Sequence, residues 1–229
     1  MQGNGKVHGN GNRTQFFEIG SLTNPQIRDT FDFPESRSTA LSEDRLQAII
    51  AMLLVELGLD IKSEHFRDTP KRVARSYREF TRGYQVNPAE ILKTFASRSR
   101  ELVVVSDVKF FSLCPHHLLI YGGKIHFGYV PDGRIVGISK IPRLIQALAA
   151  RAVVQEELVA DIADAFMSVV KPLGCAVNAI GKHDCVAARG VRSAEAKITT
   201  LALRGIFSED QNYSQKFYQD IAHNGHCVR

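Results

Sequence analysis

The sequence has no hydrophobic run long enough to cross a membrane, and little that would direct the chain out of the cytoplasm. None of its segments approaches the roughly 18 consecutive apolar residues of a transmembrane helix. The N-terminus lacks the apolar core of a secretory signal peptide, and it has too few arginines for a transit peptide. We therefore expect a cytoplasmic protein that does not associate with membranes.

Cysteine is scarce and tryptophan is absent. The cysteines are Cys114, Cys175, Cys185 and Cys227. Two disulfides could form from these four residues, but a chain of 229 residues can bury an adequate core without them. Because Cys114 and Cys185 each lie two residues from a histidine, we favour reduced thiols and a cytosolic setting.

The charge balance is only mildly basic. Hydrophobic residues make up 44% and charged residues 23% of the chain, as in an ordinary soluble globular protein. A net charge of +5 favours anionic partners, but the basic residues are dispersed along the sequence. We therefore expect no nucleic-acid partner, and a polyanionic small molecule fits the same charge.

The chain divides near residue 38. Residues 1–38 begin with a Gly/Asn-rich run that has neither helix nor strand period, so we expect a mobile N-terminal arm. The remaining residues, 39–229, form the predicted folded domain. Its first part, 39–98, is predicted to be helical, and its second part, 99–229, is predicted to contain the sheet.

Hydrophobic spacing predicts two helices in the first part. Ser42 is a good N-cap, and it precedes a row of apolar residues at helix spacing that Gly58 is placed to end. The row consists of Leu46, Ile49, Ile50, Leu53, Leu54 and Leu57. A second helix is predicted from Thr69-Pro70, as N-cap and first helical residue, to Gly83.

From residue 101 the pattern changes to strand period. Strands are predicted at residues 102–105, 124–130, 134–138, 175–180 and 197–203. Asp132-Gly133 is a hairpin signal. Helical spacing returns after Ser139, from Gln155 to Lys171-Pro172 and over residues 214–222. The pattern indicates an α+β domain with an antiparallel sheet and inserted helices.

Two short segments contain most of the residues suited to a transition metal, Cys114-Pro115-His116-His117 and His183-Asp184-Cys185. Cys114 and His117 have C-x2-H spacing, so one turn could aim both side chains at a single ion. Thiolate and imidazole ligands suit Zn²⁺ better than Mg²⁺ or Ca²⁺. With Cys185 as third ligand, a fourth position would stay open, which is typical of catalytic zinc.

Two histidines remain beside these predicted ligands. Adjacent residues of an extended chain point in opposite directions, so we expect His117 to bind the metal and His116 to carry protons. If residues 183–185 lie on a strand, His183 and Cys185 face one cavity, and His183 is placed to act as an acid or base. The alternative is a satisfied core histidine beside an inert buried cysteine.

Residues suited to a nucleotide lie near predicted helix starts. A buried carboxylate in Gln155-Glu156 could accept two hydrogen bonds from a guanine edge. Lys140 and Arg143, after Ser139, oppose the helix dipole unless a polyphosphate binds there. Arg189 adds a further cation. For each of these residues the alternative is an ordinary solvated side chain in a first helical turn or loop.

In order along the chain, these motifs resemble the GTP cyclohydrolase I family. The matching segments are Cys114-x-His116-His117, Gly123-Lys124 to Tyr129-x-Pro131, Gly137-x-Ser139-Lys140-x-x-Arg143, Gln155-Glu156, His183-x-Cys185-x-x-x-Arg189-Gly190 and, upstream, Asp68-Thr69-Pro70-x-Arg72. The resemblance covers about residues 42–220 with compatible spacing, and several independent motifs make it specific. It implies a tunnelling fold, an antiparallel sheet with helices on one face, preceded by an N-terminal helical pair.

The resemblance also implies a reaction, the hydrolysis of GTP to formate and 7,8-dihydroneopterin triphosphate, the first step of folate and pterin biosynthesis. By matching positions, Cys114, His117 and Cys185 would hold Zn²⁺, whose bound water would add to C8 of guanine. His183 would protonate N7 during opening of the imidazole ring. The family assembles as a homodecamer with sites between subunits, so we expect a homo-oligomer.

The remaining site residues follow from the same resemblance. His116 and Ser139 would assist proton transfers at C8 and the ribose. Glu156, with Gln155 beside it, belongs to the catalytic set and would anchor the guanine. The triphosphate would be held by Lys140, Arg143, Arg189 and, from a neighbouring subunit, Arg72.

Several departures and two alternatives accompany this interpretation. Glu157 replaces a usual arginine and Pro115 a usual glutamate, which bears on subunit contacts and substrate placement more than on the reaction. One alternative is another tunnelling-fold enzyme of pterins or deazapurines. Pterin synthases typically bind zinc through three histidines, and the deazaguanine reductase uses a cysteine nucleophile, so neither pattern matches. The other is a non-catalytic zinc-stabilised nucleotide-binding module, which predicts a closed, four-ligand metal site.

Overall fold

The structure is a computed structural model that describes residues 43–224. The predicted N-terminal arm, the N-cap Ser42 and Cys227 lie outside this range. Across the described residues, no helix combines the length and apolarity needed to span a membrane.

Two helices begin the described chain. Helix α2 (Glu43–Glu56) starts with Glu43 and Asp44 in its first turn, where acidic side chains oppose the positive helix end. Gly58 follows with φ +76°, the left-handed conformation expected of a glycine that ends a helix. Helix α3 (Thr69–Thr81) starts one residue earlier than predicted, because Asp68 occupies the N-cap position.

Glu43 joins these two helices electrostatically. Its carboxylate lies 3.3 Å from Arg75 and 3.1 Å from Arg78, both on α3. Part of the basic face of α3 is therefore neutralised within the chain. The rest of the predicted helix to Gly83 is a 3-10 turn, η1 (Arg82–Gln85).

A small sheet follows that the sequence did not indicate. After α4 (Pro88–Ile91), strand β1 (Thr94–Ala96) pairs antiparallel with β4 (Arg134–Val136). Gly133 has φ +73° in the predicted turn. The interpretation of Asp132-Gly133 as the turn of a hairpin is nevertheless wrong, because the strand after it pairs with β1 instead of with the strand before it.

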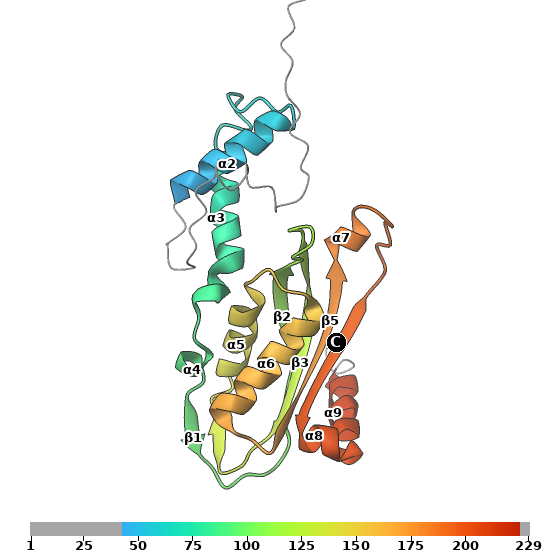
Figure 1. Cartoon of the computed structure of the whole chain (residues 1–229). Coiled ribbons are helices and arrows are strands. Elements are labelled where there is room, and N and C mark those ends of the chain that lie inside the picture. The colour runs from blue at the N-terminus through green and yellow to red at the C-terminus, as the bar shows by residue number, and fades with distance from the viewer. Residues whose placement is uncertain (1–42, 225–229) are drawn as a thin grey trace, which may run out of the picture. The chain divides into compact units, whose positions relative to one another are not determined.

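The main sheet has four antiparallel strands in the order β2-β3-β5-β6. They are β2 (Val103–Leu113), β3 (Ile120–Val130), β5 (Gly174–His183) and β6 (Ile198–Gly205). Helices α5 (Lys140–Ala149) and α6 (Gln155–Val170) cover one face, as Figure 1 shows. This arrangement confirms the predicted α+β class.

Aromatic side chains of β3 form the centre of this layer. Phe127 and Tyr129 are two residues apart on β3, so both side chains point toward the helices. Both rings pack edge-on against Phe166 of α6, with 4.7 and 5.0 Å between centroids. Each of the three side chains is at most 2% exposed. Burial of this size stabilises the contact between β3 and α6 by several kcal/mol, at about 25 cal/mol per Å² of apolar surface.

The chain ends in a second small core on the other face of the sheet. Helices α8 (Ile206–Glu209) and α9 (Gln211–Asn224) place Phe207 and Phe217 against Val130 of β3. The sheet thus has helices on one face along most of its length and, in addition, this terminal pair at one end of the other face (Figure 1). The terminal helix begins three residues before the predicted Ser214.

Candidate metal centre and active site

The turn between β2 and β3 positions the first half of the candidate metal site. Leu113 and Ile120 are the last paired residues of the hairpin, so residues 114–119 form its loop. Within this loop the Leu118 N–H donates to the Cys114 carbonyl at 2.8 Å, and Leu118 has φ +52°. This single tight turn brings the side chains of Cys114 and His117 to the same side.

The end of β5 positions the second half. Tyr121 of β3 pairs in register with His183, the last residue of β5, so Cys185 follows directly beside the hairpin loop. Cys185 lies in a short helical turn, α7 (Asp184–Ala187). The conditional prediction that residues 183–185 form one strand is therefore wrong. The strand ends at His183, and the helical turn directs the Cys185 thiol toward Cys114.

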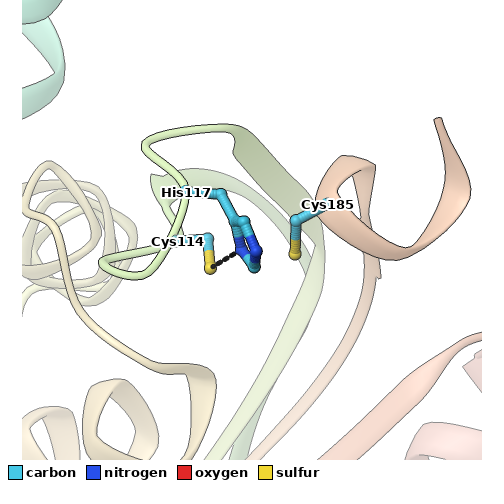
Figure 2. A group of neighbouring side chains, drawn as sticks. All are labelled: Cys114, His117 and Cys185. Carbon is cyan, nitrogen blue, oxygen red and sulfur yellow. Dashed lines mark hydrogen bonds between the residues drawn. The ribbon is translucent and has the colours of Figure 1, made fainter. Parts of the chain in front are cut away.

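Cys114, His117 and Cys185 form a group that could hold a metal ion. Their ligand atoms all lie within 4.8 Å of one another, and Cys114 Sγ is 3.7 Å from His117 Nδ1. Figure 2 shows the two loop side chains and Cys185 converging from different segments. Two sulfurs and one imidazole nitrogen suit Zn²⁺, and three protein ligands leave room for a fourth.

The surroundings of Cys185 raise the pKa of its thiol. Burial raises this pKa, and hydrogen bonding to Cys114 and the charge of the Cys114 sulfur raise it further. Two thiolates therefore do not coexist easily in this site without a positive charge. A divalent cation would supply that charge, because metal coordination deprotonates thiols.

His116 lies beside the group but outside it. Its Nδ1 is 3.7 Å from Cys114 Sγ, and its ring is 6.3 Å from the His117 ring at an angle of 74°. Its side chain is exposed. His117 Nδ1 is equally far from Cys114 Sγ, but of the two histidines only His117 belongs to the group that also includes Cys185.

His183 is held by the buried side chain of Gln155. The Gln155 amide nitrogen donates to the Ile198 carbonyl at 3.0 Å, which leaves Gln155 Oε1 facing His183 Nε2, also at 3.0 Å. Because this oxygen can only accept, the bond requires a proton on Nε2. Among the described residues, His183 Nδ1 has no hydrogen-bond partner. Burial lowers the pKa of His183, while nearby Glu156 opposes that shift.

Glu156 is exposed in the chain, unlike the buried carboxylate considered from the sequence. Gln155 is the buried member of the pair, at 0% exposure. The charge of Glu156 acts on the His183 imidazole, whose pKa it raises against the effect of burial. Arg189, in the turn after α7, is exposed and lies near Cys185, whose pKa it lowers.

The structure does not bring three predicted residues to the metal group. Ser139, Lys140 and Arg143 begin α5 just after β4. The N–H of Val136 in β4 donates to the Tyr129 hydroxyl at 3.4 Å, so this region lies at the far end of β3. Tyr129 is eight residues from Tyr121, a separation of about 26 Å at about 3.3 Å per strand residue.

Arg72 is also separate from the group. It is exposed, and its guanidinium pairs with Asp68 at 3.4 Å within α3. The link between α3 and the metal loop is the Tyr77 hydroxyl, which donates to the Leu118 carbonyl at 3.5 Å. None of the contacts described for residues 43–224 joins Arg72 itself to the metal group.

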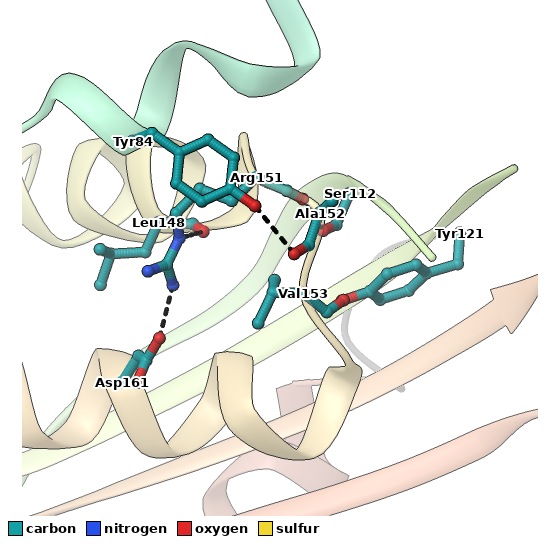
Figure 3. A network of polar contacts seen from close by, with 8 residues as sticks. All are labelled: Tyr84, Ser112, Tyr121, Leu148, Arg151, Ala152, Val153 and Asp161. Carbon is teal, nitrogen blue, oxygen red and sulfur yellow. Dashed lines mark hydrogen bonds and ion pairs between the residues drawn. The ribbon is translucent and has the colours of Figure 1, made fainter. Parts of the chain in front are cut away.

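Sequence reasoning missed Tyr121 and the segment 151–153. Tyr121 is 1% exposed, and its ring stacks on the His183 imidazole with 4.3 Å between centroids and 12° between planes. Its hydroxyl donates to the Val153 carbonyl at 2.8 Å, as Figure 3 shows. The alternation of side chains along the strand could have placed Tyr121 on the face covered by helices. Its pairing with His183, however, depends on the register of β3 and β5.

Comparison with known proteins agrees with the geometry. The family model described as GTP cyclohydrolase I matches residues 46–222. A GTP cyclohydrolase 1 of Dehalococcoides mccartyi is 38% identical, over 80% of this chain and 98% of its own length. Those of Chlorobium chlorochromatii and Mycolicibacterium vanbaalenii are 41% and 43% identical, over 79% and 73% of this chain and 82% and 84% of their own lengths.

Proposed function

The chain belongs to the GTP cyclohydrolase I family, and on that premise we propose that it hydrolyses GTP. The proposed reaction opens the guanine imidazole ring at C8 and gives formate and 7,8-dihydroneopterin triphosphate, the first step of folate and pterin biosynthesis. The observation that carries the proposal is the convergence of the ligand atoms of Cys114, His117 and Cys185 within 4.8 Å, two residues along the chain from His183. Three protein ligands would leave the fourth position of tetrahedral zinc for water.

The donor set fits Zn²⁺, and Cys114, His117 and Cys185 would hold it. When bound, the ion would supply the acidity that makes water a nucleophile toward C8 near neutral pH. The tight loop around Leu118 and the end of β5 position the three side chains next to one another.

His183 would carry the proton for N7 of the guanine. Gln155 keeps a proton on Nε2, so Nδ1 is the nitrogen that remains for substrate. Lowering of the His183 pKa by burial makes its protonated form a stronger acid, which suits delivery of a proton to a ring nitrogen. His116 and, from another subunit, Ser139 would assist the later transfers at C8 and the ribose.

Recognition of the substrate would come from two ends of the sheet. Glu156, beside Gln155, would accept hydrogen bonds from the guanine edge. Arg189, next to the metal group, would hold the triphosphate together with Lys140, Arg143 and Arg72. Because Lys140 and Arg143 begin α5 at the far end of β3, they would reach the metal group of another subunit. This separation supports a homo-oligomer, in the proposal a decamer, with sites between chains.

The central experiment measures formate release from GTP by purified protein supplied with zinc in excess. Cys185→Ser should lose bound zinc and formate release together, by roughly 1,000-fold or more in rate, because it removes a ligand. Cys175→Ser is the matched control, since Cys175 is buried and its thiol donates to the Ala163 carbonyl, away from the metal group. Wild-type rates in Cys185→Ser would exclude the proposed site.

One other result would change the assignment of function without changing the family. Protein that binds zinc and GTP and yet releases no formate would be a nucleotide-binding module. We expect the active enzyme in the cytoplasm, which fractionation of the cells that produce it would test.

A further inference from the structure

We propose that Tyr121 is a positioning residue that fixes the orientation of the His183 imidazole through ring stacking, and that its hydroxyl ties this pair to segment 151–153. The inference deepens the proposed function, because it concerns the side chain that would protonate the substrate. Tyr121 would touch neither substrate nor metal, and would act through His183.

The register of β3 and β5 places the two rings together. Tyr121 and His183 are directly paired residues, so their side chains leave the same face of neighbouring strands. The rings are nearly parallel, at 12°, with centroids 4.3 Å apart. An aromatic face at this distance blocks rotation of the imidazole out of its plane, whereas a single hydrogen bond would permit rotation about that bond.

Gln155 supplies the second restraint on the same ring. Its Oε1 faces His183 Nε2 at 3.0 Å, and its amide nitrogen is anchored by the Ile198 carbonyl and the Thr200 hydroxyl, each at 3.0 Å. Gln155 thus sets the direction in which Nε2 points, and Tyr121 sets the plane of the ring. Together they fix where Nδ1, the nitrogen available to substrate, is aimed.

Tyr121 is itself fixed by segment 151–153, whose three carbonyls all accept hydrogen bonds. The Arg151 carbonyl accepts from the Leu113 N–H and the Ser112 hydroxyl, at 3.3 and 2.9 Å. The Ala152 carbonyl accepts from the Tyr84 hydroxyl at 3.0 Å. The Val153 carbonyl accepts from the Tyr121 hydroxyl at 2.8 Å. Figure 3 shows these side chains around the segment.

One residue separates the same segment from Gln155, the first residue of α6. The Val153 N–H donates to the Leu113 carbonyl at 3.1 Å, one residue before Cys114. The Arg151 guanidinium adds an ion pair with Asp161 of α6 at 2.7 Å. Segment 151–153 therefore links the metal loop, the Gln155 amide and, through Tyr121, the His183 ring.

The hydroxyl of Tyr121 is suited to a permanent donor role. Burial raises the pKa of Tyr121 to about 12, so the hydroxyl keeps its proton across the range in which the protein would work. The bond to Val153 therefore does not depend on pH near neutrality.

Tyr129 provides the control for a purely structural role. It lies on the same strand and the same face, and it is as buried as Tyr121, at 2% against 1% exposure. Its hydroxyl accepts from the Val136 N–H at the far end of β3. Substituting either tyrosine therefore removes similar packing, but the removal of Tyr121 alone changes the surroundings of His183.

The experiment compares Tyr121→Leu and Tyr121→Phe with Tyr129→Leu and Tyr129→Phe. Measurements are bound zinc, kcat and KM for formate release, and the orientation of the His183 ring in crystal structures. Tyr121→Leu should lower kcat on the order of 10- to 100-fold with unchanged zinc, because a small misplacement of a reacting group has effects of this size. Tyr121→Phe keeps the stack but loses the tie to Val153, and should lower kcat by about 3-fold. The Tyr129 variants should retain kcat.

Ring orientation distinguishes failure of this inference from failure of the proposed function. If the wild-type protein released no formate, a His183 ring in several orientations in Tyr121→Leu would still support positioning by Tyr121. A ring in its original orientation in that variant would overturn the inference, whatever the rate. Equal losses of kcat in the Tyr121 and Tyr129 pairs would also overturn it. If Tyr121→Leu does not fold, the two phenylalanine variants are compared instead. A loss of kcat in Tyr121→Phe but not in Tyr129→Phe would support the inference, and equal kcat values would overturn it.

Discussion

The two ends of the main sheet use the same strands for different purposes. At the metal end, residues 114–121 of the β2–β3 hairpin meet residues 183–189 after β5. At the closed end, Val130 and Gly174 meet α8 and α9. Figure 1 shows the β2–β3 turn and α7 at the upper end of the view, and α8 and α9 at the lower end.

The difference lies in how completely each end is buried. At the closed end, Val130, Phe207 and Phe217 are at most 1% exposed. Gly205 there has φ +57°, and a β-carbon would lie 2.2 Å from the Leu173 carbonyl oxygen, so the backbone closes without room for a side chain. At the metal end, His117 is exposed, and two thiols and one imidazole converge within 4.8 Å. The groups proposed to react at C8 and N7 are therefore separated from the buried apolar packing of the closed end.

The largest effect that tests this separation should come from His183→Ala. It removes the proposed proton carrier, so kcat for formate release should fall by about 100- to 10,000-fold, the usual contribution of a general acid. Bound zinc should be retained, because His183 lies outside the ligand group. The exposed residue His65 gives the control, since His65→Ala should retain kcat. Full activity in His183→Ala would show that His183 is not the proton carrier.

The second prediction concerns the closed end. Phe217→Ala should lower the free energy of unfolding by about 3–5 kcal/mol, because it leaves a cavity where a fully buried ring lay. Phe111→Ala, which removes a ring that is 64% exposed, should lower it far less. The kcat of folded Phe217→Ala should stay near that of the wild type. Chemical denaturation and formate release on the same samples measure both quantities, and a large loss of kcat would show that the ends are coupled.

The third prediction tests whether the two ends meet between chains. Arg143→Ala should raise KM for GTP on the order of 10-fold, as expected for loss of a charged hydrogen bond to phosphate. An equal mixture of Cys185→Ser and Arg143→Ala chains, refolded together, should regain about a quarter of the wild-type sites if each site uses one end from each of two subunits. Each variant refolded alone is the control, and no gain on mixing would place the whole site in one chain.

Sequence periodicity predicted most elements because their signals are local. The helix face from Leu46 to Leu57 and the run from Gln155 to Lys171 carry their spacing within single segments, and both are helices in the structure. The C-x2-H spacing likewise depends on one turn. Ligand chemistry suggests Cys185 as the third ligand, but its approach to Cys114 depends on the pairing of β3 with β5, which no local pattern specifies.

The remaining features depend on pairings between distant segments. The β1–β4 pairing joins residues about 40 positions apart, and nothing in either short strand specifies the other. The stack of Tyr121 on His183 requires the exact register of β3 and β5, and a shift of one residue would separate the rings. The position of Arg143 at the far end of β3 follows from the path of the chain through β4, which periodicity does not encode.

The smallest predicted effect lies between the two ends, at a bulge in β2. Asp107 has φ +58° there and pairs with Lys124 at 2.6 Å, although both side chains are more than one-third exposed. This hydrogen bond to Lys124 lowers the pKa of Asp107. The pair therefore stabilises the fold above the ordinary aspartate pKa, and its contribution is lost as pH falls through the lowered value.

Asp107→Asn removes the charge but tolerates the left-handed backbone, so it isolates the ion pair. At pH 7 it should lower the free energy of unfolding by about 0.2–1 kcal/mol, the usual range for an exposed pair. The difference from wild type should shrink toward zero below the lowered pKa and also at high salt. Denaturation at several pH values measures this. A difference in stability that persists in acid would mean that Asp107 acts through the geometry of the bulge. A change in kcat would mean that the structural change at the bulge reaches the metal end.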